Sequence, residues 1–150
     1  MNTCETKTNG YSTCIFNAAL LILRIVIGVV MAAHGAQKVF GAFGGHGLEA
    51  TVGFMGPIGY LVSVGEFFGG LGMLLGFLTR FSALSNLVIQ IGAIVKVHLV
   101  NGFFLGANPG FEYNFTLIGI LICLVLAGPG RYAIIRLTPK GMGKIIRFIE

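Results

Sequence analysis

The chain has 150 residues, of which 55% are hydrophobic and only 10% are charged, and its mean hydropathy is +0.90. Soluble domains carry about 25% charged residues, so this composition excludes an ordinary soluble enzyme or binding domain. The net charge of +5 needs no nucleic-acid partner, because positive charges also mark the cytoplasmic side of a membrane protein.

Four apolar segments account for most of the chain. They are residues 15–37, 58–79, 81–100 and 115–128, and the last is the shortest. An α-helix rises about 1.5 Å per residue, so roughly 20 apolar residues cross a bilayer core about 30 Å thick. The sequence therefore predicts an all-α, polytopic membrane protein built as a bundle of four transmembrane helices.

The first apolar segment follows a polar N-terminal tail, residues 1–14, that lacks the basic start of a signal peptide. The segment is also longer than the apolar part of such a peptide, about 7–15 residues, so we expect it to remain as the first membrane helix. We expect residues 1–13 to be poorly ordered. The membrane domain then covers residues 15–138, and a basic C-terminal tail covers residues 139–150.

The positive charges predict the orientation. Half of the ten Lys and Arg residues follow Gly130, namely Arg131, Arg136, Lys140, Lys144 and Arg147. Positively charged flanks stay in the cytoplasm, so the C-terminus is cytoplasmic, and four spans place the N-terminus there too. Connections 38–57 and 101–114 then face outward. Segment 140–150 can lie on the inner surface as a short basic amphipathic helix.

Ionisable residues inside apolar segments are the best indication of function, because hydrocarbon penalises charge. The orientation places most of them near the outer ends of the helices. The candidate set is His34, Lys38, Glu66, His98, Asn101, Glu112 and Tyr113. Such a polar cluster is either a ligand site or a network that only holds the helices together, and the sequence leaves both open.

Arg24 and Glu66 lie deepest in the predicted membrane. A charge at mid-membrane costs about 2.5–3.5 kcal/mol on insertion scales, so each should find a partner. Their predicted depths differ by less than about two helical turns. We therefore expect an Arg24–Glu66 ion pair that holds the first two helices in register. The alternative is that Arg24 reaches the inner surface and Glu66 is protonated.

Glycine is concentrated at two places. The second segment carries Gly65, Gly69, Gly72 and Gly76 at spacings of four, three and four, a pattern that predicts close helix packing. Residues 34–47 read HGAQKVFGAFGGHG, which predicts a re-entrant or interfacial loop, with a lid over a pocket as the alternative.

Metal and disulfide sites are not expected. Cys4, Cys14 and Cys123 form no C-x-x-C pair, which argues against a disulfide framework and a redox dithiol. The three histidines have no recognised ligand spacing. No motif for haem, flavin or iron–sulfur binding is recognisable.

Several stretches resemble the DoxX family of small four-helix membrane proteins of bacteria and archaea. They are LLILRIVIGVVMAAHGAQKVFGAFGGHG at 20–47, GEFFGGLGMLLGFLTR at 65–80, VHLVNGFF at 97–104, FEYN at 111–114 and GPGRY at 128–132. They occur in the family's order and cover most of residues 17–137. After GPGRY the chain continues AIIRLTPKGMG, where the family often has a serine and an acidic residue.

The resemblance implies a multi-pass protein of the bacterial inner membrane. The family is named after a subunit of a quinone-linked thiosulfate-oxidising complex, and other members are linked to redox or thiol-stress systems. This implies an accessory subunit of a quinone-linked or thiol/oxidative-stress redox system, which would need a redox protein partner and would not be catalytic alone. In that interpretation His34, Lys38, Glu66, His98 and Glu112 would bind a quinone between aromatic walls formed by Phe67, Phe103 and Tyr113.

A second function class remains open. The chain would then be a non-enzymatic assembly or scaffold module in the lipid bilayer, or a small carrier for a lipid or metabolite. Transport by so small a bundle would require a homo-oligomer.

Overall fold

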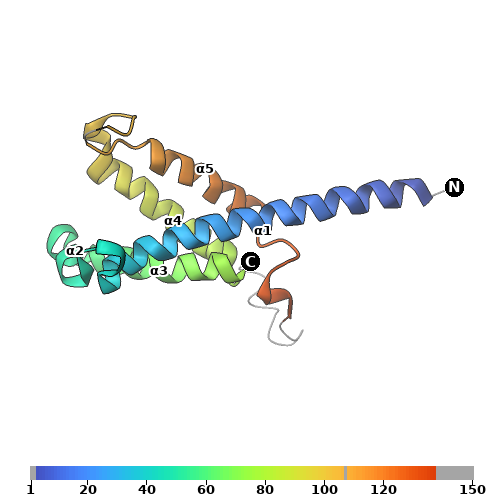
Figure 1. Cartoon of the computed structure of the whole chain (residues 1–150), viewed down its shortest axis with the longest axis horizontal. Helices are drawn as coiled ribbons and strands as arrows, with labels where there is room; N and C mark the ends of the chain where they lie inside the picture. Colours follow the sequence, from blue (N-terminus) through green and yellow to red (C-terminus); the bar gives the residue numbers. More distant parts are fainter. Residues whose placement is uncertain (1–2, 107, 138–150) are drawn as a thin grey trace.

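The computed structural model describes residues 3–106 and 108–137, and these residues form a helical bundle (Figure 1). Its α-helices are α1 (Thr3–Phe40), α2 (Gly47–Met55), α3 (Ile58–Leu75), α4 (Thr79–Ala93) and α5 (Glu112–Ala127). Short turns of 3-10 helix lie at Ala42–Gly44, Leu99–Asn101 and Ile134–Leu137, and a π-helical turn, Ile94–His98, extends α4. The described part of the chain contains no β-strand, only an isolated bridge between Leu105 and Pro109.

Three helical stretches are long and apolar enough to cross a membrane: Ser12–Phe40, Ile58–Leu75 and Thr79–Asn101. The fourth apolar segment also forms a helix, α5, but its 16 residues extend only about 24 Å. That length is less than the roughly 30 Å of a bilayer core. The structure therefore supports a helical membrane protein with three candidate spans and a shorter fourth apolar helix.

The ends of the chain differ from expectation or lie outside the described residues. We expected residues 1–13 to be poorly ordered, whereas α1 begins at Thr3. The physical reason is that a helix, once formed, adds one hydrogen bond for each residue that it gains, so the apolar segment can extend into the polar tail. The expected interfacial helix at residues 140–150 lies outside the described residues.

Helices α1 and α3 lie antiparallel and side by side (Figure 1). Small residues on both helices permit this contact. A Cβ atom on Gly28 would lie 2.7 Å from the backbone nitrogen of Leu74, and one on Gly70 would overlap the backbone of Ala32. Gly35 meets the backbone of Phe67 in the same way. The two backbones therefore touch along α3, as small residues allow in membrane helices.

The glycine stripe of the second apolar segment faces α4 instead. A Cβ atom on Gly65 would lie 2.9 Å from Cδ1 of Ile89, and one on Gly69 would overlap the side chain of Asn86. Gly72 lies against Ser82. Gly76 has a different role, since its φ of 72° ends α3 in a left-handed turn.

The interior and exterior are arranged as in a membrane bundle. Large apolar side chains cover the outside of every long helix, among them Ile22, Leu61, Val88 and Leu126. A small apolar core joins α1, α3, α4 and α5 and contains Leu20, Ile27, Met31, Met73, Ala83, Leu117, Leu121 and Leu124. The interior of the described residues also contains polar side chains, among them Glu66 of the candidate site.

The α1–α3 contact predicts a difference between two Gly→Ala substitutions. Gly70→Ala should lower the free energy of unfolding by about 1–3 kcal/mol, because the new methyl group overlaps the backbone of α1. Gly119→Ala on α5 is the control, because a Cβ atom there meets nothing within 4 Å. It should be neutral or stabilising by up to about 1 kcal/mol. Denaturant titration in detergent measures both, and equal effects would contradict the assigned contact.

Candidate functional site

Eight polar or charged side chains are buried in the described part of the chain: Arg24, Ser63, Glu66, Thr79, Ser82, Asn86, Gln90 and Asn114. In hydrocarbon no water is available to bind such groups, so their partners have to come from the protein. The two buried charges lie near opposite ends of the α1–α3 contact.

Glu66 forms an ion pair with Lys38. Glu66 lies in the middle of α3 and is only 3% exposed, and its Oε2 contacts Nζ of Lys38. Lys38 lies in the last turn of α1, and its side chain is 29% exposed. The pair therefore joins the C-terminal end of α1 to the buried carboxylate on α3, while the Lys38 side chain stays partly exposed.

The structure corrects the predicted Arg24–Glu66 pair. The guanidinium of Arg24 donates to three backbone carbonyl oxygens: Nε to Met73 at 3.1 Å, Nη2 to Tyr132 at 2.9 Å, and Nη1 to Pro129. Because α1 and α3 are antiparallel, Arg24 lies level with Met73. That residue is seven positions from Glu66, which is about 10 Å along the helix.

Arg24 thereby fixes the segment that follows α5. Met73 is in the last turn of α3, where carbonyl groups lack partners within the helix and a cation is favourable. The backbone N–H of Arg131 also donates to Oδ1 of Asn17 at 2.6 Å, and the Cys14 thiol lies 3.8 Å from the Tyr132 hydroxyl. That hydrogen bond raises the pKa of Tyr132 above its ordinary value. These contacts give the Arg24 end of the bundle a structural role, since they hold the segment after α5 against α1 and α3.

At the other end of the α1–α3 contact, His34 and Gln37 together connect α1, α5 and the glycine-rich loop. Its Nε2 lies 3.4 Å from the hydroxyl of Tyr113 on α5, and the two rings meet edge to face with centroids 6.1 Å apart. Its Nδ1 lies 3.2 Å from Oε1 of Gln37. Gln37 in turn donates to the carbonyl of Phe43 in the glycine-rich loop, at 3.4 Å.

Three other predicted site residues hold the loop between α4 and α5. His98 Nδ1 lies 2.9 Å from the carbonyl oxygen of Pro109, and Asn101 donates to the same oxygen at 3.2 Å. Glu112 accepts a hydrogen bond from the backbone N–H of Leu105 at 3.2 Å. Their contacts fasten the loop and do not bring them to the Lys38–Glu66 pair.

The prediction of site residues missed a buried chain of amides. Asn114 Nδ2 donates to Oε1 of Gln90 at 2.7 Å, and Gln90 Nε2 contacts the sulfur of Met31 at 3.6 Å. This chain joins α5, α4 and α1. Gln90 lies on a polar face of its segment, but Asn114 immediately precedes the fourth apolar segment and gives no periodic signal.

The geometry therefore separates one small site from the rest of the polar residues: His34, Lys38, Glu66 and Tyr113, called the outer site after the orientation that the sequence predicts. His34 and Lys38 are one turn apart on the same face of α1 and carry Tyr113 and Glu66 as partners. The edge-to-face pair Phe40–Phe67, with centroids 5.3 Å apart, lies beside them in sequence. The outer site combines an ammonium donor, an imidazole and a phenol, groups that can bind an acceptor oxygen and move a proton. The described residues contain no group of His, Cys, Asp and Glu arranged to hold a metal ion.

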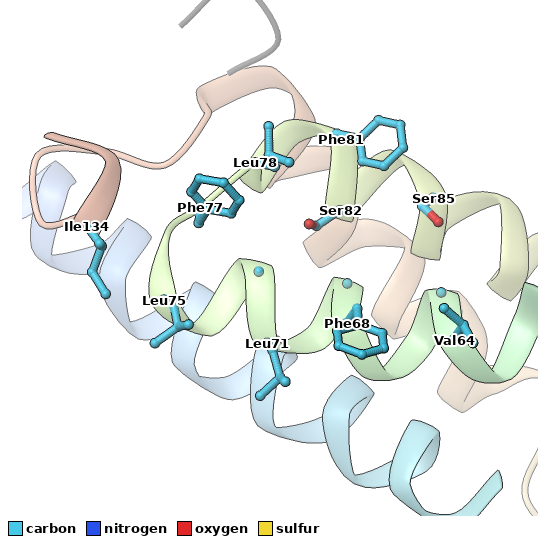
Figure 2. A pocket seen from close by; sticks show the side chains of 13 residues that line it. Val64, Phe68, Leu71, Leu75, Phe77, Leu78, Phe81, Ser82, Ser85 and Ile134 are labelled. Atoms are coloured by element: carbon cyan, nitrogen blue, oxygen red, sulfur yellow. The ribbon is translucent and has the colours of Figure 1, made fainter. Parts of the chain in front are cut away.

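A separate apolar groove of about 580 Å³ lies between α3 and α4 (Figure 2). Gly65, Gly69 and Gly72 contribute to it from α3. Its other lining residues are Val64, Phe68, Leu71, Leu75, Phe77, Leu78, Phe81, Ser82, Ser85 and Ile134. With no charged residue in its lining, the groove suits hydrocarbon rather than a polar headgroup.

The Lys38–Glu66 pair predicts that substitutions of the two residues have strongly non-additive effects on the free energy of unfolding in a double-mutant cycle. Lys38→Met should cost about 3 kcal/mol of unfolding free energy, because it leaves Glu66 buried without its partner. Adding Glu66→Gln should recover most of that loss. Denaturant titration in detergent measures all four proteins.

Arg24 supplies the matched control for this cycle. The effects of Arg24→Leu and Glu66→Gln should add within about 0.5 kcal/mol, because Arg24 donates to backbone carbonyls at the far end of α3 whereas Glu66 pairs with Lys38. Strong coupling between Arg24 and Glu66, with additive effects at Lys38 and Glu66, would contradict the Lys38–Glu66 pair and support the predicted Arg24–Glu66 pair.

Comparisons with known proteins agree with this architecture. A DoxX family profile matches residues 19–99. "Inner membrane protein YqjF" of Escherichia coli is 33% identical over 125 residues, which cover 83% of this chain and 95% of the relative. "Putative oxidoreductase CatD" of Bacillus subtilis is 30% identical over 115 residues, which cover 73% of this chain and 80% of the relative.

An uncharacterized membrane protein of Mycobacterium tuberculosis is 31% identical over 139 residues, which cover 81% of this chain and 82% of the relative. No solved structure matches the chain. The family profile covers more than half of the chain, and the similarity to YqjF extends over most of both proteins. The chain therefore belongs to the DoxX family of membrane proteins.

Proposed function

We propose that the protein is an accessory subunit of a quinone-linked redox system and binds a quinone headgroup at its outer site. The observation that carries this proposal is the pairing of Lys38 with Glu66 and of His34 with Tyr113 on adjacent turns of α1. A quinone carbonyl accepts hydrogen bonds, and both pairs end in groups that can donate one. The relative CatD, which carries the word oxidoreductase in its name, supports a redox role.

The proposed topology has four spans with both termini in the cytoplasm of a bacterial cell. Three helical stretches have the length and composition of spans, and α5 would be a short fourth one. The basic residues Arg131 and Arg136 after α5 favour a cytoplasmic C-terminus. This orientation puts the outer site at the external leaflet, where a quinone can enter from the membrane.

The chemical roles follow from exposure and charge. Lys38 is accessible and would donate to one carbonyl oxygen, while Glu66 keeps the ammonium group in place from the buried side. His34 would exchange a proton at the site, Tyr113 would donate a hydrogen bond to the headgroup, and Phe40 and Phe67 would contact its ring. Phe103 packs against Phe104 and Phe111 within the α4–α5 loop, so we give it no part in binding.

A partner protein would supply the electrons. The sequence contains no recognisable motif for haem, flavin or iron–sulfur binding, so we assign electron transfer to a partner subunit. The apolar groove between α3 and α4 favours the second candidate function, an assembly module that receives a partner helix or a lipid chain.

Quinone retention tests the proposal. Protein purified in native-lipid discs should contain about one quinone per chain by mass spectrometry, and Glu66→Gln or His34→Ala should reduce it to background. Glu112→Gln is the matched control, because its side-chain carbonyl can still accept from Leu105, and it should keep the quinone. A protein free of quinone that copurifies with a reproducible partner would favour the assembly module.

A further inference from the structure

A hydrogen-bond chain connects the glycine-rich loop to the outer site. It runs from the carbonyl of Phe43 to Gln37 Nε2, from Gln37 Oε1 to His34 Nδ1, and from His34 Nε2 to the Tyr113 hydroxyl. The separations are 3.4, 3.2 and 3.4 Å. These hydrogen bonds thus join the loop, α1 and α5 through the amide of Gln37 and the imidazole of His34.

The chemistry of each group determines which atom donates and which accepts in these hydrogen bonds. A backbone carbonyl only accepts, so the amide nitrogen of Gln37 has to face Phe43 and the amide oxygen has to face His34. That oxygen also only accepts, so Nδ1 of His34 carries a hydrogen. A neutral imidazole has a single N–H, which leaves Nε2 with its lone pair toward Tyr113.

We propose that Gln37 is a positioning residue that fixes neutral His34 as the Nδ1–H tautomer and leaves Nε2 as its basic atom. The inference rests on the proposed function for its purpose, since it assigns the atom that exchanges a proton at the outer site. The tautomer itself follows from the hydrogen-bond chain alone.

The hydrogen-bonding role of the Tyr113 hydroxyl depends on whether His34 is protonated. While His34 is neutral, the Tyr113 hydroxyl donates to Nε2. When Nε2 takes up a proton from solvent, both ring nitrogens become donors, and the Tyr113 oxygen has to accept from Nε2–H. The hydrogen of the Tyr113 hydroxyl then turns toward a ligand oxygen, and no bond within Tyr113 breaks. The site in this state suits a ligand with an acceptor oxygen, such as a carbonyl.

Glycine allows the loop to reach Gln37. A Cβ atom on Gly45 would overlap the backbone of Gln37, so only glycine lets the loop lie against α1 there. Gly41, with φ of 70°, and Phe43, with φ of 52°, turn the chain back toward α1. The conformation of this loop therefore determines whether the Phe43 carbonyl holds the Gln37 amide in the required orientation.

Nitrogen-15 NMR of protein with labelled histidine, in bilayers of synthetic lipid, tests the proposal. Protonated and unprotonated ring nitrogens have well-separated shifts, and the chain has only three histidines. Spectra are taken at alkaline pH, and a neutral ring is recognised because it has one protonated and one unprotonated nitrogen. A His34→Phe protein identifies the His34 signals by their loss.

The expected wild-type spectrum has His34 protonated at Nδ1 and not at Nε2. Gln37→Leu should move a measurable fraction of His34 to the Nε2–H tautomer, because Nδ1 loses its acceptor while Tyr113 can still accept. Gln37→Glu should restore the Nδ1–H form, since a carboxylate oxygen accepts from it. Asn101→Leu, which removes the amide that donates to the Pro109 carbonyl beside His98, should leave His34 unchanged.

Two results would overturn the inference: an Nε2–H tautomer in the wild-type protein, or an unchanged tautomer in Gln37→Leu. If Gln37→Leu fails to fold, the wild-type spectrum decides alone. A protein with the expected tautomer that retains no quinone would overturn the proposed function and support this inference. Quinone retention with the other tautomer would overturn this inference alone.

Discussion

The contact between α1 and α3 determines where every buried charge of the bundle lies. Between membrane helices the hydrophobic effect gives little attraction, so close packing of small residues and polar pairing have to hold them together. Gly28, Gly35 and Gly70 bring the two backbones into contact and thereby fix the register. In that register Arg24 lies beside Met73, and Lys38 reaches Glu66.

The two ends of this contact are chemically different. At one end the guanidinium of Arg24 is buried and already donates to three carbonyl groups, so it is committed to holding the fold. At the other end, which contains the outer site, Lys38 is partly exposed and Tyr113 is 40% exposed. An ammonium group has three hydrogens, and one ion pair leaves some of them available. This difference is the physical argument for proposing a ligand at the outer site.

The sequence was sufficient to predict the long helices, because apolar segments long enough to cross a membrane rarely form any other structure. Segments 15–37, 58–79 and 81–100 coincide largely with the three candidate spans. The short helix α2, at Gly47–Met55, was not predicted, since it lies in a connection without a clear apolar period. Family membership was predicted from motifs spread along the chain and is confirmed.

Partners of individual polar residues could not be predicted in the same way. Depth counted from the ends of apolar segments suggested an Arg24–Glu66 pair, but the register depends on glycine contacts between helices, which one sequence does not specify. His98, Asn101 and Glu112 were assigned to a common cluster by depth alone. They instead satisfy backbone groups of the α4–α5 loop, whose fold is set by local hydrogen bonds.

Photolabelling tests most directly whether the outer site binds a ligand. A photoreactive quinone analogue, added to the protein in lipid discs and followed by peptide mapping, reports which side chains line its binding site. The account predicts labelling at Phe40, Phe67 and Tyr113 that excess unlabelled quinone prevents. Labelling confined to Phe68 and Phe81 in the α3–α4 groove, or labelling that quinone does not prevent, would contradict it.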